Sequence, residues 1–202
     1  MMVFNLTDEH QLVRQTAREF AEQHLKPIAA ELDQTARFPA EIVKQMAELG
    51  FMGIAIPEAY GGAGMDYLSY ALVVEEISRV CGSTGVILSA HSSLACDPIN
   101  ANGTEEQKNK FLTPMASGKK IGCFGLTEPA AGSDAGSLKT SAVLEKDEWV
   151  LNGSKIFITN GAEAEVAVVF AVTDREKGAK GISALSWKKA PPAFPSVKRK
   201  KN

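Results

Sequence analysis

The chain has 202 residues, of which 45% are hydrophobic and 23% are charged, a composition that excludes wholesale disorder and a collagen-like fibre. Its 22 Lys and Arg residues against 24 Asp and Glu residues give a formal net charge of -2, yet the last 15 positions hold six basic residues and no acidic residue. No apolar run approaches the roughly 20 residues that span a bilayer, and the N-terminus turns acidic at once instead of resembling a signal sequence, so we expect a cytoplasmic protein.

Residues 1–119 are predicted to form an all-α domain, because their apolar residues recur at helical spacing. Thr7 is a good N-cap for a first helix over residues 8–25, which Pro27 interrupts. A second helix is predicted from Pro39, at its first position, to Gly50 as its C-terminal stop. Residues 56–65 are rich in Gly and Pro and therefore predict a loop.

Three more helices are expected before the pattern changes. The helix that starts at Asp66 has apolar residues on more than one face, which is typical of an interior helix. Residues 83–99 are small and nearly uncharged, and they predict a further buried helix. Thr104 and Gln107 form a capping box for the last helix.

After Lys120 the sequence takes on the features of strands. Apolar runs on both sides of Asn152 and Gly153 predict a hairpin with a two-residue turn at those residues. Residues 165–174 and 180–185 predict two further strands. Helices followed by strands indicate an α+β chain, with the all-α domain followed by a small antiparallel β-sheet or barrel over residues 120–185.

The cysteines and histidines do not predict a metal site. His10 and His24 lie in the polar-faced first helix and are expected to be solvated, whereas His91 is expected to be a core histidine and not a catalyst. The cysteines lack CxxC spacing, so reduced thiols used as small core residues are favoured over a disulfide or zinc site. They are Cys81, Cys96 and Cys123.

Residues 123–138, CFGLTEPAAGSDAGSL, fit neither the helical nor the strand pattern. Gly125 and Gly132 would let the backbone approach a ligand closely, and Thr127, Ser133 and Asp134 supply hydroxyl and carboxylate groups. This combination suits a planar, hydrogen-bonding cofactor that carries phosphates. By composition alone, a plain connecting loop is an equally good interpretation.

Within this segment, GLTEPAAGSDAGS resembles the signature segment of the acyl-CoA dehydrogenases. NGSKIFITNG, residues 152–161, is similar to the second flavin-contacting segment of that family and lies at the expected separation. Stretches that begin at Phe4, Glu58 and Gly103 resemble the same family, so the similarity runs from about residue 4 to Leu185. Among the members, the short-chain or butyryl-CoA dehydrogenases are the most similar.

The resemblance implies FAD as the cofactor, a fatty acyl-CoA as the substrate, α,β-dehydrogenation as the reaction and an electron-transfer flavoprotein as the electron acceptor. It implies that Thr127 donates a hydrogen bond near the reactive nitrogen of the flavin, where negative charge arrives with the hydride. Ser133 would also contact the acyl-CoA substrate. The residues implied to bind the cofactor are Phe124, Gly125, Leu126, Thr127, Gly132, Ser133, Phe157, Ile158 and Thr159.

Two of these assignments have alternatives within the sequence. Without the resemblance, Phe157 and Ile158 would be interpreted as ordinary alternation in a strand. Glu128 is acidic and central to the motif, which makes it a candidate base, but the family does not use this position as its base.

No catalytic residue is predicted within the chain. In the family, the glutamate base belongs to a C-terminal four-helix domain, which also supplies much of the flavin site and most of the interface of the homotetramer, and that domain is missing here. A general base typically contributes about 10²–10⁴-fold to the rate. We therefore expect the 202-residue chain to bind FAD weakly, to have little or no activity, and not to assemble as full-length members do.

Residues 186–202, SWKKAPPAFPSVKRKKN, depart from the family pattern. One allowed coding of this tail, read in a shifted frame, restores a family-like Ile-Val-Glu-Lys-Gly-Thr-Pro-Gly-Phe, so we interpret the tail as a disordered frameshift product. The frameshift interpretation also explains the charge asymmetry, because residues 1–187 contain 16 basic and 24 acidic residues, a formal charge of -8.

Two other classes of function were considered. The chain could be a non-catalytic flavin- or acyl-CoA-binding or assembly module that pairs with a separately encoded C-terminal half. Binding to nucleic acid or a membrane surface through KRKK, residues 198–201, is disfavoured, because no aromatic residues are interleaved with these charges and the rest of the chain is acidic.

Overall fold

The computed structural model describes residues 5–188. The chain divides into two compact units, residues 1–120 and residues 121–202, which we call unit 1 and unit 2 and describe separately. The basic tail predicted over residues 186–202 lies mostly outside the described residues, and its first three residues end the last strand of unit 2. Across residues 5–188, no helix combines the length and the apolar character that crossing a bilayer requires.

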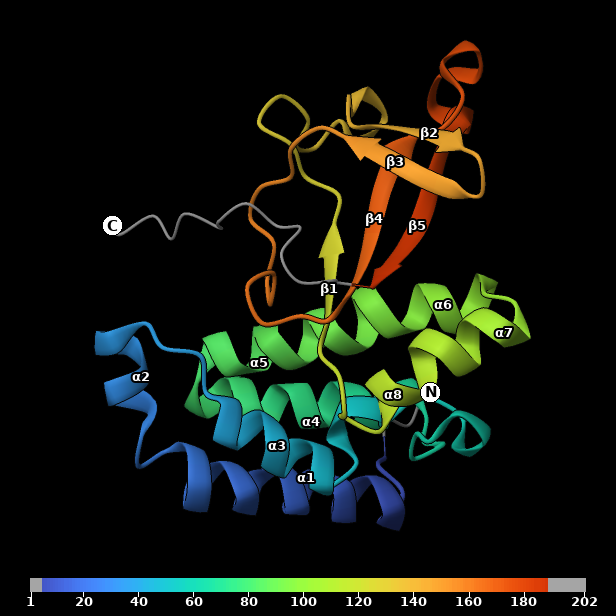
Figure 1. Ribbon diagram of the computed structural model, residues 1–202. Helices are drawn as coiled ribbons and strands as arrows, with labels where there is room; N and C mark the ends of the chain where they lie inside the picture. Colours follow the sequence, from blue (N-terminus) through green and yellow to red (C-terminus); the bar gives the residue numbers. More distant parts are fainter. Residues whose placement is uncertain (1–4, 189–202) are drawn as a thin grey trace. The chain divides into compact units, whose positions relative to one another are not determined.

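Unit 1 is helical, and its helices follow the predicted order except for a short helix over residues 29–35, which was not predicted (Figure 1). Several of them continue through π-helical segments, at residues 21–25, 90–96 and 108–112, so that residues 8–25, 82–102 and 105–116 each form one continuous helical run. The α-helices are α1 (Asp8–Phe20), α2 (Ala29–Thr35), α3 (Ala40–Glu48), α4 (Tyr67–Val80), α5 (Gly82–Ser89), α6 (Asp97–Asn102), α7 (Glu105–Gln107) and α8 (Thr113–Ala116).

The predicted helix starts are confirmed by the capping geometry. The side chain of Thr7 accepts a hydrogen bond from the amide of His10, and the Thr104 side chain accepts one from Gln107 in a capping box. Gly50 follows α3 with a φ of 76°, a left-handed conformation that favours glycine. These short polar and glycine residues determine where the helices begin and end.

The packing of α4 is less complete than predicted. Leu72, Val73 and Ile77 are buried along one face, as expected for a helix inside the unit. Tyr67 and Leu68 are 61% and 45% exposed, so the interpretation of α4 as apolar and buried on most sides is wrong for its first turn. The first turn is thus accessible, although α4 packs against α1 and α5.

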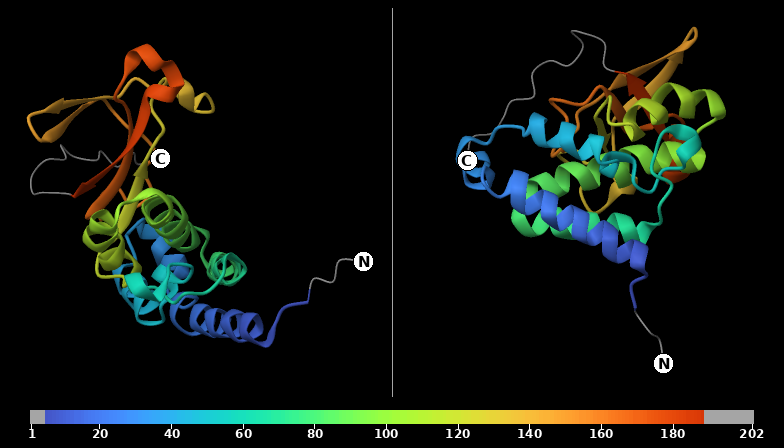
Figure 2. Two further views of the ribbon diagram at one scale, coloured as in Figure 1. Left: turned by 90° about the vertical axis from the view of Figure 1, so that its right-hand side faces the viewer. Right: turned by 90° about the horizontal axis from the view of Figure 1, so that it is seen from below.

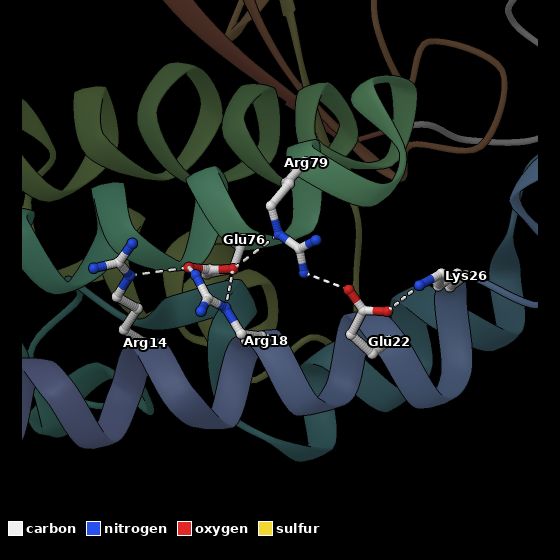
Figure 3. Close-up of polar contacts among 6 residues, drawn as sticks. All are labelled: Arg14, Arg18, Glu22, Lys26, Glu76 and Arg79. Atoms are coloured by element: carbon white, nitrogen blue, oxygen red, sulfur yellow. Dashed lines mark hydrogen bonds and ion pairs between the residues drawn. The ribbon is translucent and has the colours of Figure 1, made fainter.

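A buried carboxylate joins α1 to α4 (Figure 3). Glu76 of α4 is 1% exposed, and its two oxygens accept hydrogen bonds from Arg14 at 2.9 Å and from Arg18 at 2.7 and 2.9 Å. Arg79, one turn further along α4, also donates to Glu76 and links it to Glu22. The pKa of Glu76 is lowered to about 2, chiefly by the hydrogen bond from Arg18, although burial opposes the shift. The two helices are thus held together by charge as well as by apolar packing.

The predicted solvation of His10 is wrong, whereas His24 is exposed as predicted. The His10 side chain is only 13% exposed, and its Nε2 lies 2.9 Å from the carboxylate of Asp66. That same carboxylate caps α4 by accepting a hydrogen bond from the amide of Ser69 at 2.8 Å. The Ser69 amide and, to a smaller extent, His10 lower the pKa of Asp66 to about 2.

Replacing Asp66 by alanine is expected to destabilise unit 1 by about 1 kcal/mol, because α4 loses its N-cap. Urea unfolding followed by far-ultraviolet circular dichroism measures the effect. Asp66→Asn retains an acceptor and should lose less, and Asp33→Ala, at an exposed carboxylate of α2, serves as the control. Equal stabilities of Asp66→Ala and Asp33→Ala would refute the capping role.

Unit 2 is built on one five-stranded sheet. The central strand β4 pairs along one edge with β5, and along the other edge first with β1 and then, through Ser141 and Val172, with β2. The hairpin of β2 and β3 projects away from the long β4–β5 pair (Figure 2). The strands are β1 (Gly122–Gly125), β2 (Ser141–Glu145), β3 (Glu148–Asn152), β4 (Val166–Val172) and β5 (Ile182–Lys188).

The sheet is mixed and not antiparallel as predicted. The pairs β2–β3 and β4–β5 are antiparallel, but β1 is parallel to β4, with Gly122 opposite Val166 and Gly125 opposite Val169. Parallel pairing requires a long connection. Residues 126–165, which contain the signature loop and the β2–β3 hairpin, supply this connection and return the chain to the end of the sheet where β1 began.

The predicted hairpin turn is also misplaced. The turn lies at Lys146 and Asp147, where Lys146 has a φ of 56°, while Asn152 ends β3 and the following residues form no strand. Gly153 is needed at its position for another reason, since a Cβ there would collide with the side chain and backbone of Thr140. The glycine thus permits close chain approach after β3 instead of a turn.

Candidate functional site

The two candidate flavin-contacting segments, residues 123–138 and 152–161, meet in unit 2. The amide of Ile156 donates a hydrogen bond of 2.9 Å to the carbonyl of Thr127, and the ammonium of Lys155 donates one of 2.9 Å to the carbonyl of Leu126. Residues 126–127 and 155–156 are almost thirty positions apart in sequence, so only the tertiary structure brings them together. The candidate site is built around this junction.

The first segment begins inside the sheet and ends at the surface. Phe124 belongs to β1, and its ring centroid lies 5.2 Å from that of Phe170 on β4. Leu126 and Thr127 follow the strand and are half-buried, whereas Gly132 and Ser133 are exposed. Gly125 is buried at the end of β1. The first segment thus runs from a strand of the sheet to an exposed loop that carries the hydroxyl group of Ser133.

The second segment is an irregular loop, so the interpretation of Phe157 and Ile158 as strand alternation is wrong. Phe157 has a φ of 57°, in the left-handed region, and is 87% exposed. Ile158 points the other way and packs against the buried cluster that includes Cys123 and Val169. Thr159 is half-buried beside it. One residue therefore anchors the loop while its neighbour presents an aromatic ring to the surface.

Glu128 is the buried carboxylate of the site and is fully engaged. It is 6% exposed, and its oxygens accept hydrogen bonds from the amide of Lys139 at 2.6 Å, the amide of Thr140 at 2.9 Å and the ammonium of Lys155 at 2.7 Å. Burial alone would raise its pKa, but the hydrogen bonds from Lys155 and Thr140 outweigh burial and lower it to about 2. An anion of this kind is a poor proton acceptor at neutral pH, in agreement with the expectation that Glu128 is not the base.

His91 of unit 1 is a core residue, as predicted. It is fully buried, its Nε2 lies 3.2 Å from the carbonyl of Met115, and burial lowers its pKa to about 4. Cys96 and Cys123 are buried free thiols and Cys81 is half-buried, which fits small core residues. Burial raises the pKa of the Cys96 thiol far above its usual range, so neither Cys96 nor His91 is charged at neutral pH.

Lys155 contacts the first segment of the candidate site, and the sequence interpretation missed it. Its side chain is 11% exposed and bridges Glu128 to the carbonyl of Leu126. The sequence offers only a weak signal, which is that Lys155 is the one basic residue of NGSKIFITNG and Glu128 is one of two acids in the other motif. Buried lysines and glutamates are rarely left unpaired, but the sequence does not show that these two residues are buried.

Two family models match nearly the whole chain. The N-terminal domain of acyl-CoA dehydrogenase matches residues 7–119, and the middle domain of acyl-CoA dehydrogenase matches residues 123–201. The short-chain specific acyl-CoA dehydrogenase of Clostridium acetobutylicum is 63% identical over 184 residues, which cover 91% of this chain and 48% of that protein. The chain thus spans about half the length of the curated relatives it matches.

Solved structures have the same fold. A chain in the structure of the electron transferring flavoprotein of Acidaminococcus fermentans has a TM-score of 0.91 and 52% identity, covering 95% of this chain and 50% of its own length. The butyryl-CoA dehydrogenase of Megasphaera elsdenii has a TM-score of 0.90 and 44% identity, covering 95% of this chain and 51% of its own length. The acyl-CoA dehydrogenase of Bacillus anthracis complexed with FAD has a TM-score of 0.84 and 36% identity, covering 93% and 32%.

These matches extend over both units and include the two segments that meet at Thr127 and Ile156. The family models together cover far more than half of the sequence. The chain therefore belongs to the acyl-CoA dehydrogenase family, whose members are oxidoreductases.

Proposed function

We propose that this chain provides the N-terminal and middle domains of an FAD-dependent, short-chain acyl-CoA dehydrogenase. The proposal rests chiefly on one observation, which is that the two candidate flavin-contacting segments are joined by hydrogen bonds and Phe157 is exposed beside the junction. The short-chain relatives support a short fatty acyl-CoA as the substrate. The likeness to a chain solved with an electron transferring flavoprotein supports such a protein as the electron acceptor.

The residues at the junction fit a flavin. A flavin is a flat aromatic ring with hydrogen-bond acceptors along its edge, and it is joined to a phosphate-bearing chain. Phe157 offers an exposed aromatic face, and Thr127, Ser133 and Thr159 offer hydroxyl groups. The carboxylate of Glu128 is buried and paired with Lys155, so its negative charge is balanced and does not repel the electron-rich ring or the phosphates.

Bound FAD would supply the two-electron acceptor for the hydride that leaves the β carbon of the acyl thioester, while the α-proton would go to the glutamate base of the family's C-terminal domain. Thr127 would hold its hydroxyl toward the developing negative charge, and Ser133 would contact the acyl-CoA. Phe157 and Thr159 would cover the cofactor and hold it away from water, and Ile158 would support them by anchoring the loop in the buried cluster. Within residues 5–188 the carboxylate of the signature motif, Glu128, is occupied by three donors, so we expect no efficient removal of the α-proton by it.

Binding of FAD to the purified 202-residue chain tests the proposal. Saturable binding is expected, and Thr127→Val should weaken it about five- to tenfold, since one hydrogen bond contributes roughly 1 kcal/mol. Titration of FAD followed by flavin absorbance and fluorescence measures the dissociation constants. Thr16→Val, on α1 of unit 1, is the control and should bind as the wild type does.

Two outcomes would contradict the proposal in different ways. Absence of saturable FAD binding would refute the cofactor assignment. Turnover of butyryl-CoA with a dye acceptor, at rates typical of the family, would instead refute the expected inactivity of the 202-residue chain. Binding of FAD and butyryl-CoA without turnover, followed by turnover on addition of a separately produced C-terminal half, would favour the assembly-module alternative.

A further inference from the structure

We infer that Glu128 and Lys155 are positioning residues, which together lock the two cofactor-contacting segments into one binding surface. The inference rests on the proposed function, because it assigns these residues a role toward FAD that depends on holding Thr127 and Phe157 in place. Neither side chain is proposed to touch the reacting atoms. They act through the segments that they join.

Two separate stretches of chain, residues 139–140 and the segment that contains Lys155, converge on the Glu128 carboxylate. One oxygen accepts from Lys155 Nζ and the amide of Thr140, and the other accepts from the amide of Lys139. The backbone of Glu128 is itself fixed by a pair of hydrogen bonds with Ala131, at 3.0 and 3.1 Å. The carboxylate therefore ties the signature loop to the start of β2 as well as to the second segment.

Lys155 adds a second tie between the two segments. Its ammonium donates both to Glu128 and to the carbonyl of Leu126, and the next residue, Ile156, donates its amide to Thr127. Consecutive residues of one segment thus hold consecutive residues of the other. Since Thr127 lies within this clamp and Phe157 lies directly after it, their separation is set by the ion pair.

Burial makes the pair interdependent. The side chains of Lys155 and Glu128 are only 11% and 6% exposed, and their charges lie 2.7 Å apart. Removing one partner leaves the other as an uncompensated buried charge, which draws in water or moves toward solvent. Either response would displace Leu126, whose carbonyl accepts from Lys155, and with it Thr127, whose carbonyl accepts from the amide of the next residue, Ile156.

Variants of the full chain separate this role from a purely structural one. Lys155→Met and Glu128→Gln are each expected to raise the FAD dissociation constant roughly 10- to 100-fold, the range found when supporting partners of a bound group are removed. They should also shift the absorption band of bound flavin and speed hydrogen exchange at the Ile156 amide. Lys155→Arg keeps the charge and should give an intermediate affinity. In Glu128→Gln/Lys155→Gln no charge is left unpaired, so the loss should be smaller than in Lys155→Met.

The matched control is Lys177→Met, which removes an exposed ion pair of the same length, 2.7 Å to Asp174, in the same unit. It should leave FAD binding unchanged. Fluorescence of Trp149 and Trp187, the two tryptophans of the chain, reports whether unit 2 is folded in each variant. If Lys155→Met unfolds unit 2, the folded double variant Glu128→Gln/Lys155→Gln decides, and its binding FAD with the affinity and flavin spectrum of the wild type would overturn the inference.

The outcomes distinguish the two proposals. If the wild-type chain does not bind FAD, the proposed function is wrong and this role falls with it. If the wild-type chain binds FAD and all Glu128 and Lys155 variants bind it with the same affinity and flavin spectrum, the proposed function stands and only the positioning role is overturned.

Discussion

Replacing Glu76 by glutamine is expected to destabilise unit 1 by about 2 to 3 kcal/mol at pH 7. The glutamine amide would leave three guanidinium groups, those of Arg14, Arg18 and Arg79, facing one another without the anion that now lies between them (Figure 3). These groups are 40% to 50% exposed, so hydration will moderate their repulsion. Urea unfolding followed by far-ultraviolet circular dichroism measures the loss, because helices predominate in unit 1.

The pH dependence provides the sharper test. The folded-state pKa of Glu76 is about 2, below its ordinary value of 4.5, so the carboxylate stabilises the fold fully above about pH 4.5 and loses this effect as the pH falls toward 2. The difference between wild type and Glu76→Gln should therefore stay constant from pH 7 to about pH 5 and shrink between about pH 4.5 and pH 2. Glu75→Gln, at the exposed neighbour on α4, should stay within about 0.5 kcal/mol of wild type. A difference that is independent of pH would contradict the assignment.

Replacing Gly153 by alanine is expected to destabilise unit 2 by about 3 kcal/mol. The new Cβ would overlap the side chain and backbone of Thr140, and the φ of 156° is rarely adopted by residues with a side chain. Thr140 is buried and its amide is one of the donors to Glu128, so it cannot move away without disturbing that carboxylate. Urea unfolding followed by the fluorescence of Trp149 and Trp187 measures the change in unit 2.

Gly136→Ala is the matched control for this prediction. Gly136 lies in the same unit, and a Cβ there would make ordinary contacts of 3.5 Å with Asp134 and 3.7 Å with Ala179. The alanine should be tolerated with little loss. Equal stabilities of the two alanine variants would show that the space at Gly153 is not limiting.

The sequence predicted only part of the candidate site. The resemblance identified Thr127, Ser133 and Phe157 from the motifs in which they stand, and their roles toward FAD remain predictions. The pairing of Glu128 with Lys155 was missed, because their positions are 27 residues apart and no local periodicity relates them. The sequence also could not predict that the Phe157 side chain is exposed. Phenylalanine rarely adopts a left-handed φ by its own conformational preference, so this φ depends on the surrounding contacts.

Local signals in the sequence were sufficient for most of unit 1. The caps at Thr7 and Thr104 and the stop at Gly50 were predicted correctly, because capping depends on hydrogen bonds within a few residues. The burial of His91 was also predicted from its small and uncharged neighbours. Such features depend on residues next to one another in the chain.

The sequence by itself therefore determined the helical unit, the existence of strands β4 and β5, and the family of the chain. Tertiary structure alone decided the parallel pairing of β1 with β4, the position of the hairpin turn, and the convergence of two distant segments on Glu128. The physical reason is the range of the interactions. Caps and periodicity act over one or two turns, whereas strand order, the space at Gly153 and a buried ion pair depend on atoms that only folding brings into contact.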